Sequence, residues 1–200
     1  MTETKLLATR DGFATGLVKA AHHNPQIVAL SADLSDSLRL AEFKKLFPSR
    51  YIECGVAEQN LAGVAAGLSL AGKIPFATSF ASFNPSRNFD QIRNIAYSKL
   101  NVKIVGGHAG LVTGEDGAFH QSLEDLSLMI ALPNMRVLSP ADARQAELAT
   151  LALAKTPGPG YLRLSRLAVS DLEFLLKALD NKTDESANFA LNQAQLLTKG

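Results

Sequence analysis

Two short segments of the sequence carry residues suited to binding a ligand ring. Glu58 comes three residues after Gly55 and stands at the predicted start of a helix, where its carboxylate could hydrogen-bond a ligand or favour the positive end of the helix dipole. Phe80 and Phe83 lie three residues apart, just beyond a predicted strand. They could line a slot for a flat heteroaromatic ring or anchor a loop in the core. Each segment alone therefore has both a functional and a purely structural interpretation.

A third segment, residues 106–121, contains five glycines, two acids and the histidines His108 and His120. Glycine allows a backbone to wrap around a ligand, and histidine can donate to phosphate or transfer protons near neutral pH. The spacing matches no standard metal-ligand motif. The segment predicts either a functional loop or a flexible surface loop.

A fourth segment, residues 31–37, combines hydroxyl side chains with acids and follows Arg10 in the chain. Hydroxyls together with an arginine could hold a phosphate group. The same residues also fit a capped turn beside a surface arginine.

Short apolar runs alternate along the chain with longer helical patterns, which must position these segments. We predict strands at residues 27–31, 50–54, 74–80, 102–106, 135–139 and 160–164, and helices at residues 10–23, 57–71, 87–99, 121–132 and 141–155. Asp142 could cap the last helix. The alternation predicts an α/β fold with a doubly wound, mostly parallel sheet and helices on both faces. Since ligands bind outside the carboxyl ends of such strands, we expect the four segments to meet there.

The composition is that of an ordinary soluble globular protein, with 46% apolar residues, 20% charged residues and a formal net charge of +1. This balance gives no reason to expect nucleic acid or a membrane as a partner. The single cysteine, Cys54, excludes a disulfide within the chain and argues against a cysteine-based zinc site. The N-terminal residues lack a signal-peptide pattern and no long apolar run exists, so we expect a cytoplasmic protein. We expect one domain at residues 1–168 and a linker or tail at 169–200, with one amphipathic helix near 171–179.

The order of the segments resembles the pyrimidine-binding domain of transketolases, and most of all the second subunit of split bacterial and archaeal transketolases. The resemblance covers residues 5–166 and is carried by GVAEQNLAGVAAGLSLAGKIPF, SFASFNPSRNFDQIR, NVKIVGGHAGLVTGEDGAFHQSLEDL, ALPNMRVLSPADA and PGYLRLSR. It implies the thiamine-diphosphate-binding fold, with the family's C-terminal domain absent from this chain. It also implies a transferase of carbohydrate metabolism in the pentose phosphate pathway, which moves a two-carbon ketol unit between sugar phosphates.

For the cofactor, the resemblance implies that Glu58 is catalytic and hydrogen-bonds the aminopyrimidine ring of thiamine diphosphate. Phe80 and Phe83 would form the pocket of that ring, and Asp33 would lie beside the cofactor at a subunit interface. The Gly-Asp-Gly signature of the diphosphate-binding domain is missing, so we expect a partner chain to hold the diphosphate and its Mg²⁺ or Ca²⁺ and this chain to hold no metal.

For the substrate, the resemblance implies that His108 and His120 are catalytic histidines near the reacting sugar. Asp116 would recognise a sugar hydroxyl, while Arg10, Ser37 and His108 would hold the sugar phosphate. One expected phosphate contact departs from the pattern of single-chain enzymes, which carry arginine where this chain has Ser139.

The resemblance further implies a chain that is inactive alone and works with a diphosphate-binding subunit. Small residues of the helix at 57–71, namely Ala62, Ala65 and Ala66, should be exposed in the isolated chain and promote a homodimer, or a heterotetramer with the partner. Three alternatives stay open: a 1-deoxyxylulose-5-phosphate synthase-like subunit, a 2-oxo acid dehydrogenase β-like subunit, and a non-catalytic assembly module.

Overall fold

A six-stranded parallel sheet with the strand order β3-β2-β4-β5-β7-β6 organises the protein. The computed structural model describes residues 6–171. The strands are β2 (Ile27–Ser31), β3 (Tyr51–Glu53), β4 (Ile74–Phe80), β5 (Lys103–Gly107), β6 (Arg136–Leu138) and β7 (Gly160–Arg163). All six were predicted to within one residue at either end, and the parallel sheet is confirmed.

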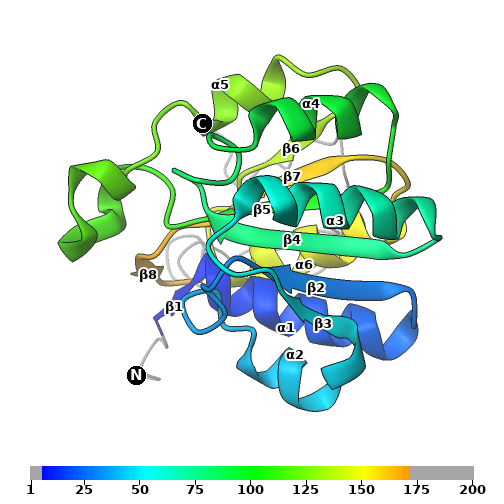
Figure 1. Ribbon diagram of the computed structural model, residues 1–200. Coiled ribbons are helices and arrows are strands. Elements are labelled where there is room, and N and C mark those ends of the chain that lie inside the picture. The colour runs from blue at the N-terminus through cyan, green and yellow to red at the C-terminus, as the bar shows by residue number, and fades with distance from the viewer. Residues whose placement is uncertain (1–5, 172–200) are drawn as a thin grey trace, which may run out of the picture.

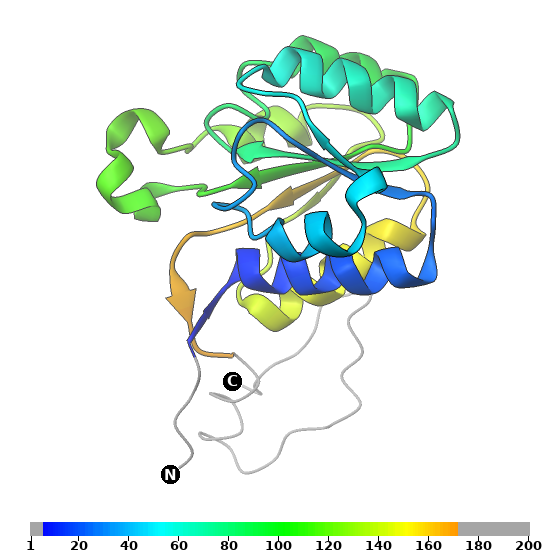
Figure 2. The ribbon, with the colours of Figure 1, turned by 60° about the horizontal axis from the view of Figure 1, so that its bottom comes forward.

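Helices cover both faces of this sheet (Figures 1 and 2). One face carries α3 (Glu58–Leu70), α4 (Phe89–Tyr97) and α5 (Asp125–Ile130), and the other carries α1 (Thr9–His23), α2 (Ala41–Leu46) and α6 (Ala143–Lys155). Each face buries its own apolar cluster, one around Phe13 and Leu17 of α1 and the other around Leu61 of α3. Since both faces are covered, every residue of the interior strand β2 is buried, which explains its apolar run from Ile27 to Leu30.

The first residues of α6 and α4 can be compared with the predicted helix starts. Asp142 caps α6, accepting a hydrogen bond of 2.7 Å from the backbone N–H of Gln145, as predicted. The α4 helix begins at Phe89, so Arg87, which we predicted to be helical, lies in the turn before it. No helix within residues 6–171 is long and apolar enough to cross a bilayer.

Several elements lay outside the prediction. These are α2, the antiparallel pair of β1 (Leu7–Ala8) with β8 (Ala168–Val169), and the 3-10 turns η1 (Pro48–Arg50), η2 (Leu111–Asp116) and η3 (Ala118–His120). The helix predicted at 121–132 begins only at Asp125, because Ser122 pairs with Gly110 in an isolated bridge. The helix predicted near 171–179 lies outside the described residues, apart from Asp171.

Two of the small residues of α3 that we predicted to be exposed face the sheet instead. Ala62 and Ala65 are fully buried in the apolar cluster that also contains Ala77 of β4, so the expectation that they are exposed is wrong. They face the sheet because the helix needs its small residues to approach β4 closely. The outward face carries Gly63 and Gly67 instead, where an added Cβ would meet nothing within 4 Å.

Candidate active site

The predicted site segments converge at the carboxyl ends of the sheet strands. Glu58 opens α3 just after β3, Phe80 ends β4, and His108 directly follows β5. The loop that carries η2 and η3 projects beyond this edge of the sheet in both ribbon views (Figures 1 and 2). Arg10 joins them from the first turn of α1.

Glu58 is a buried carboxylate with both oxygens hydrogen-bonded. Its side chain is 3% exposed. The Ser79 hydroxyl donates to Oε1 at 3.1 Å, and Arg87 Nη1 donates to Oε2 at 3.2 Å. A buried charge of this kind requires such partners, since its desolvation otherwise costs several kcal/mol. The acid singled out from the sequence is therefore placed in a dry, organised position.

Two buried asparagines that the sequence analysis did not single out hold the start of α3. Asn88 Nδ2 donates to the backbone carbonyl of Glu58 at 3.0 Å and to Oδ1 of Asn84 at 2.9 Å. The Asn84 amide in turn donates to the carbonyls of Ala77 and Val105, both at 3.0 Å. This chain of amides fixes Glu58 relative to β4 and β5.

An aromatic cluster, defined here as Phe80, Phe83, His108 and His120, lies next to the acid. Phe80 stacks on His108 with a centroid distance of 4.0 Å, and it stacks on Phe83 at 6.1 Å. His120 meets the ring of Phe83 edge-on at 5.4 Å. The cluster is tied to Glu58 through Arg87, whose guanidinium lies 3.9 Å from the Phe83 centroid.

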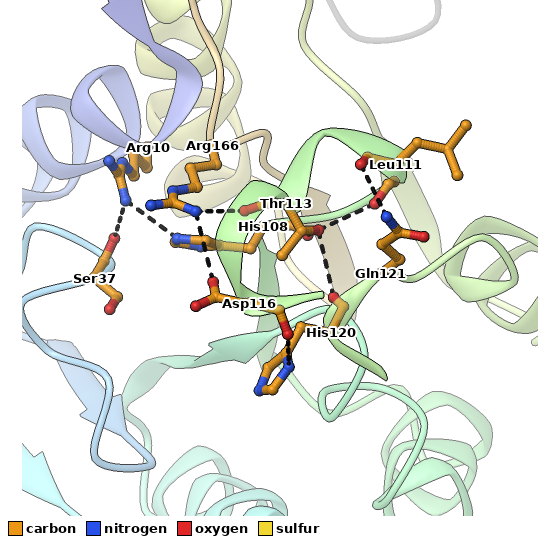
Figure 3. Close-up of polar contacts among 10 residues, drawn as sticks. Arg10, Ser37, His108, Leu111, Thr113, Asp116, His120, Gln121 and Arg166 are labelled. Carbon is orange, nitrogen blue, oxygen red and sulfur yellow. Dashed lines mark hydrogen bonds and ion pairs between the residues drawn. The ribbon is translucent and has the colours of Figure 1, made fainter. Parts of the chain in front are cut away.

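Arg10, His108 and the backbone of Ser37 lie together (Figure 3). Arg10 Nη1 donates to the Ser37 carbonyl at 3.1 Å and lies 3.2 Å from His108 Nε2. A guanidinium can only donate, so Nε2 accepts and the imidazole proton sits on Nδ1. Both Nδ1 of His108 and Nε of Arg10 are buried donors with no partner in the described part of the chain. Two donors that lack an acceptor in this way suit a bound anion.

His108 is neutral in the folded protein. Burial, followed by the positive charges of Arg10 and Arg166, lowers the pKa of His108 to about 4. At neutral pH the imidazole is therefore uncharged, and its role as a donor to phosphate or in proton transfer stays a prediction.

The stability of the protein is expected to fall on acidification because of His108. Between pH 6.5 and about 4, His108 is protonated in the unfolded chain but not in the folded protein. The free energy of unfolding therefore declines as the pH falls across that window. The difference amounts to about 3 kcal/mol at most. Urea unfolding of wild type and His108→Gln at pH 7 and pH 4.5 measures it, with the exposed His23→Gln as control. Equal pH dependence in wild type and His108→Gln would contradict this explanation.

The projecting loop is tied back to the body by Thr113 and Arg166 (Figure 3). The Thr113 hydroxyl donates to the His108 carbonyl at 2.8 Å, and Arg166 donates to the Thr113 carbonyl while lying 3.8 Å from the Asp116 carboxylate. His120 Nδ1 donates to the Asp116 carbonyl at 2.8 Å. Arg166 is thus a site residue that the sequence analysis missed, although it ends the PGYLRLSR segment.

Asp125 anchors the far end of the same loop. Its fully buried carboxylate accepts from the Tyr161 hydroxyl at 2.8 Å and from Arg163 Nε at 2.9 Å. Burial, followed by the negative charge of Asp125, raises the pKa of Tyr161 well above its ordinary value. Tyr161 therefore stays a hydroxyl donor throughout the physiological range.

Asp33 was predicted to lie beside the cofactor, but its side chain is exposed and contacts none of the other predicted site residues. Asp33 adopts a left-handed backbone with φ of 59°, and its N–H donates to Glu53 Oε1 at 2.7 Å. Within residues 6–171, no three His, Cys, Asp or Glu side chains gather as a metal site would require.

Comparison with known proteins gives consistent matches. The family profile "Transketolase, pyrimidine binding domain" matches residues 5–170. A putative transketolase C-terminal section of Methanocaldococcus jannaschii is 42% identical over 96% of this chain and 58% of its own length. A 6-deoxy-6-sulfo-D-fructose transketolase subunit of Clostridium sp. is 39% identical over 96% of this chain and 56% of its own length.

A solved structure described as a split gene transketolase, inactive beta4 tetramer, superposes with a TM-score of 0.82. It is 45% identical and covers 97% of this chain and 60% of its own chain. The protein thus spans somewhat more than half the length of the curated relatives it matches.

Proposed function

The chain belongs to the transketolase pyrimidine-binding domain family, and from this premise we propose that it is the pyrimidine-binding subunit of a thiamine-diphosphate-dependent transketolase. It would transfer a two-carbon ketol unit between sugars when a diphosphate-binding chain completes the site. Its relatives, named as transketolase subunits and sections, support this proposal.

The observation that carries the proposal is the buried Glu58 beside the aromatic cluster. Its carboxylate is 3% exposed and is linked through Arg87 to the face of Phe83. A dry acid at the edge of stacked rings suits a flat base that needs one hydrogen bond at a ring nitrogen. When bound, thiamine diphosphate supplies the electron sink for breaking and forming the bond beside a sugar carbonyl. Glu58 would hold the ring nitrogen, while Phe80 and Phe83 would bound the ring.

The substrate end of the proposal depends on the donors around His108. The unpartnered Nδ1 of His108 and Nε of Arg10 suit the anionic terminal group of a sugar, in the first place a phosphate. Asp116 and His120 lie on the loop at the same edge and would bind sugar hydroxyls. Ser139 is exposed at the end of β6 and supplies no charge, so the phosphate contact depends more strongly on Arg10.

A role in the pentose phosphate pathway and a cytoplasmic location are parts of the proposal. One relative is named for 6-deoxy-6-sulfo-D-fructose, a sugar outside that pathway. We propose that the partner chain holds the diphosphate and its divalent cation, in a heterotetramer. A related split-gene protein described as an inactive beta4 tetramer supports self-association of such chains without activity.

The test is complementation of the full chain with the diphosphate-binding subunit of a split transketolase, thiamine diphosphate and Mg²⁺. We expect ketol transfer from a ketose phosphate to an aldose phosphate in the mixture and none with either chain alone. Pyruvate as the donor separates the rivals, because product formation from pyruvate would favour a deoxyxylulose phosphate synthase or an oxo acid dehydrogenase. An assembly module would bind the partner yet gain no thermal stabilisation from the cofactor.

A further inference from the structure

Arg87 contacts two groups that the proposed function assigns to the cofactor ring. We propose that Arg87 is a positioning residue that occupies the edge of the pyrimidine site in the cofactor-free chain, and that it must release Glu58 when a ring nitrogen binds there. This inference depends on the proposed function of Glu58 and adds a residue to it.

The geometry places one guanidinium over both groups. Arg87 Nη1 lies 3.2 Å from Glu58 Oε2, and its guanidinium carbon lies 3.9 Å from the centroid of Phe83. A flat group at that height covers the ring face much as a stacked heterocycle would. The ring nitrogen of a cofactor would therefore compete with Arg87 for Oε2 and for the adjacent space.

Only one contact has to break for Glu58 to become available. Ser79 keeps Oε1 at 3.1 Å, and Asn88 keeps the backbone carbonyl of Glu58 at 3.0 Å. The Arg87 side chain is 49% exposed, whereas Glu58 is 3% exposed, so the arginine can move outward into solvent while the acid stays in place. Arg87 also precedes α4, so its movement does not require a helix to unwind.

The charges of Arg87 and Glu58 determine how their contact affects stability and cofactor binding. A guanidinium donates hydrogen bonds and keeps its proton, so Arg87 saturates Oε2 with a donor. A buried acid without a partner is costly, and Arg87 therefore stabilises the cofactor-free chain. The same contact must weaken cofactor binding, because the ligand has to replace it before it gains its own hydrogen bond.

A merely structural ion pair makes the opposite prediction for binding. Loss of such a pair would destabilise the chain and loosen the site, so both stability and cofactor affinity would fall. Under our proposal the two quantities move in opposite directions when Arg87 is replaced.

The experiment compares Arg87→Gln with Arg93→Gln in the complex with a diphosphate-binding subunit. Arg93 is a matched control because it lies on α4 over Tyr97, at 5.2 Å from the ring centroid, and is not a partner of Glu58. We expect Arg87→Gln to lower the melting temperature without cofactor and to bind thiamine diphosphate about tenfold more tightly by calorimetry, the order of one charge-assisted hydrogen bond. Arg93→Gln should match wild type in affinity.

Equal or weaker binding by Arg87→Gln would overturn the inference. Should that variant not fold, a crystal structure of the wild-type complex with thiamine diphosphate decides the question directly. There the Nη1–Oε2 contact should be absent, and its persistence overturns the proposal. If Glu58→Gln alone leaves cofactor affinity unchanged, the proposed function itself fails, whatever Arg87 does.

Discussion

Replacing Glu58 with glutamine is expected to reduce ketol transfer in the complemented complex by about a hundredfold or more, the range of a lost acid–base contribution. The amide has nearly the same shape and can still accept from the Ser79 hydroxyl, so the buried position remains filled. It cannot share a proton with a ring nitrogen as a carboxyl group can. The measurement is kcat for ketol transfer at saturating thiamine diphosphate.

The matched control for this variant is Glu42→Gln. Glu42 is exposed in the first turn of α2, on the opposite face of the sheet from α3. It should leave kcat unchanged, and both variants should show a wild-type circular dichroism spectrum. Wild-type turnover in a folded Glu58→Gln protein would show that the buried carboxylate has no part in the reaction.

The residues at strand ends could be placed from the sequence because the fold dictates their location. Once β3, β4 and β5 are recognised as strands of one parallel sheet, Glu58, Phe80 and His108 must appear at one edge of it. The four interior strands were found because both faces of the sheet are covered and each reads as a short, mostly apolar run, while the edge strands β3 and β6 are shorter and more exposed. For these elements local pattern and tertiary structure agree.

The partners of those residues could not be found in the same way. Arg87 follows Glu58 by 29 positions and meets it only because α3 and the turn before α4 pack side by side. Arg166 lies 53 positions from the Thr113 carbonyl that it binds. Pairings over such sequence distances leave no periodic signal, since they depend on how the elements pack.

Lys103 shows the same limit in the core. It occupies a predicted apolar strand yet is 1% exposed, and its Nζ donates to oxygens of Asn101, Thr156 and Gly158 at 2.7, 2.8 and 2.6 Å. These acceptors lie at the amino end of β5, away from the site. Burial lowers the pKa of Lys103 to about 7, with the positive charge of Arg136 as a smaller cause.

The projecting loop departed most from the prediction because glycines set its path. Gly110, Gly114 and Gly117 adopt φ values of 84°, 79° and 77°, a region that other residues rarely occupy. The helix predicted from residue 121 therefore begins only at Asp125, because Ser122 forms a bridge with Gly110. The sequence indicated a functional loop here, but its two 3-10 turns arise from these backbone angles.

Replacing Gly12 with alanine is expected to destabilise the protein by about 3 kcal/mol or more. Gly12 lies on α1 where the helix crosses α6, and an added Cβ would stand 1.8 Å from the carbonyl oxygen of Ala143. The obstacle is backbone, so no side-chain rotation relieves it and the two helices must separate. Thermal and urea unfolding of the full chain measure the effect.

The matched control is Gly63→Ala, a glycine in the interior of α3 whose added Cβ would meet nothing within 4 Å. Alanine is the better helix former, so this variant should gain about 0.5–1 kcal/mol. Because α1 also presents Arg10 to Ser37 and His108, a shift of α1 in Gly12→Ala should also weaken substrate binding. If Gly12→Ala unfolds at the same urea concentration as Gly63→Ala, then α1 and α6 do not pack backbone to backbone, and the position of Arg10 must be set by other contacts.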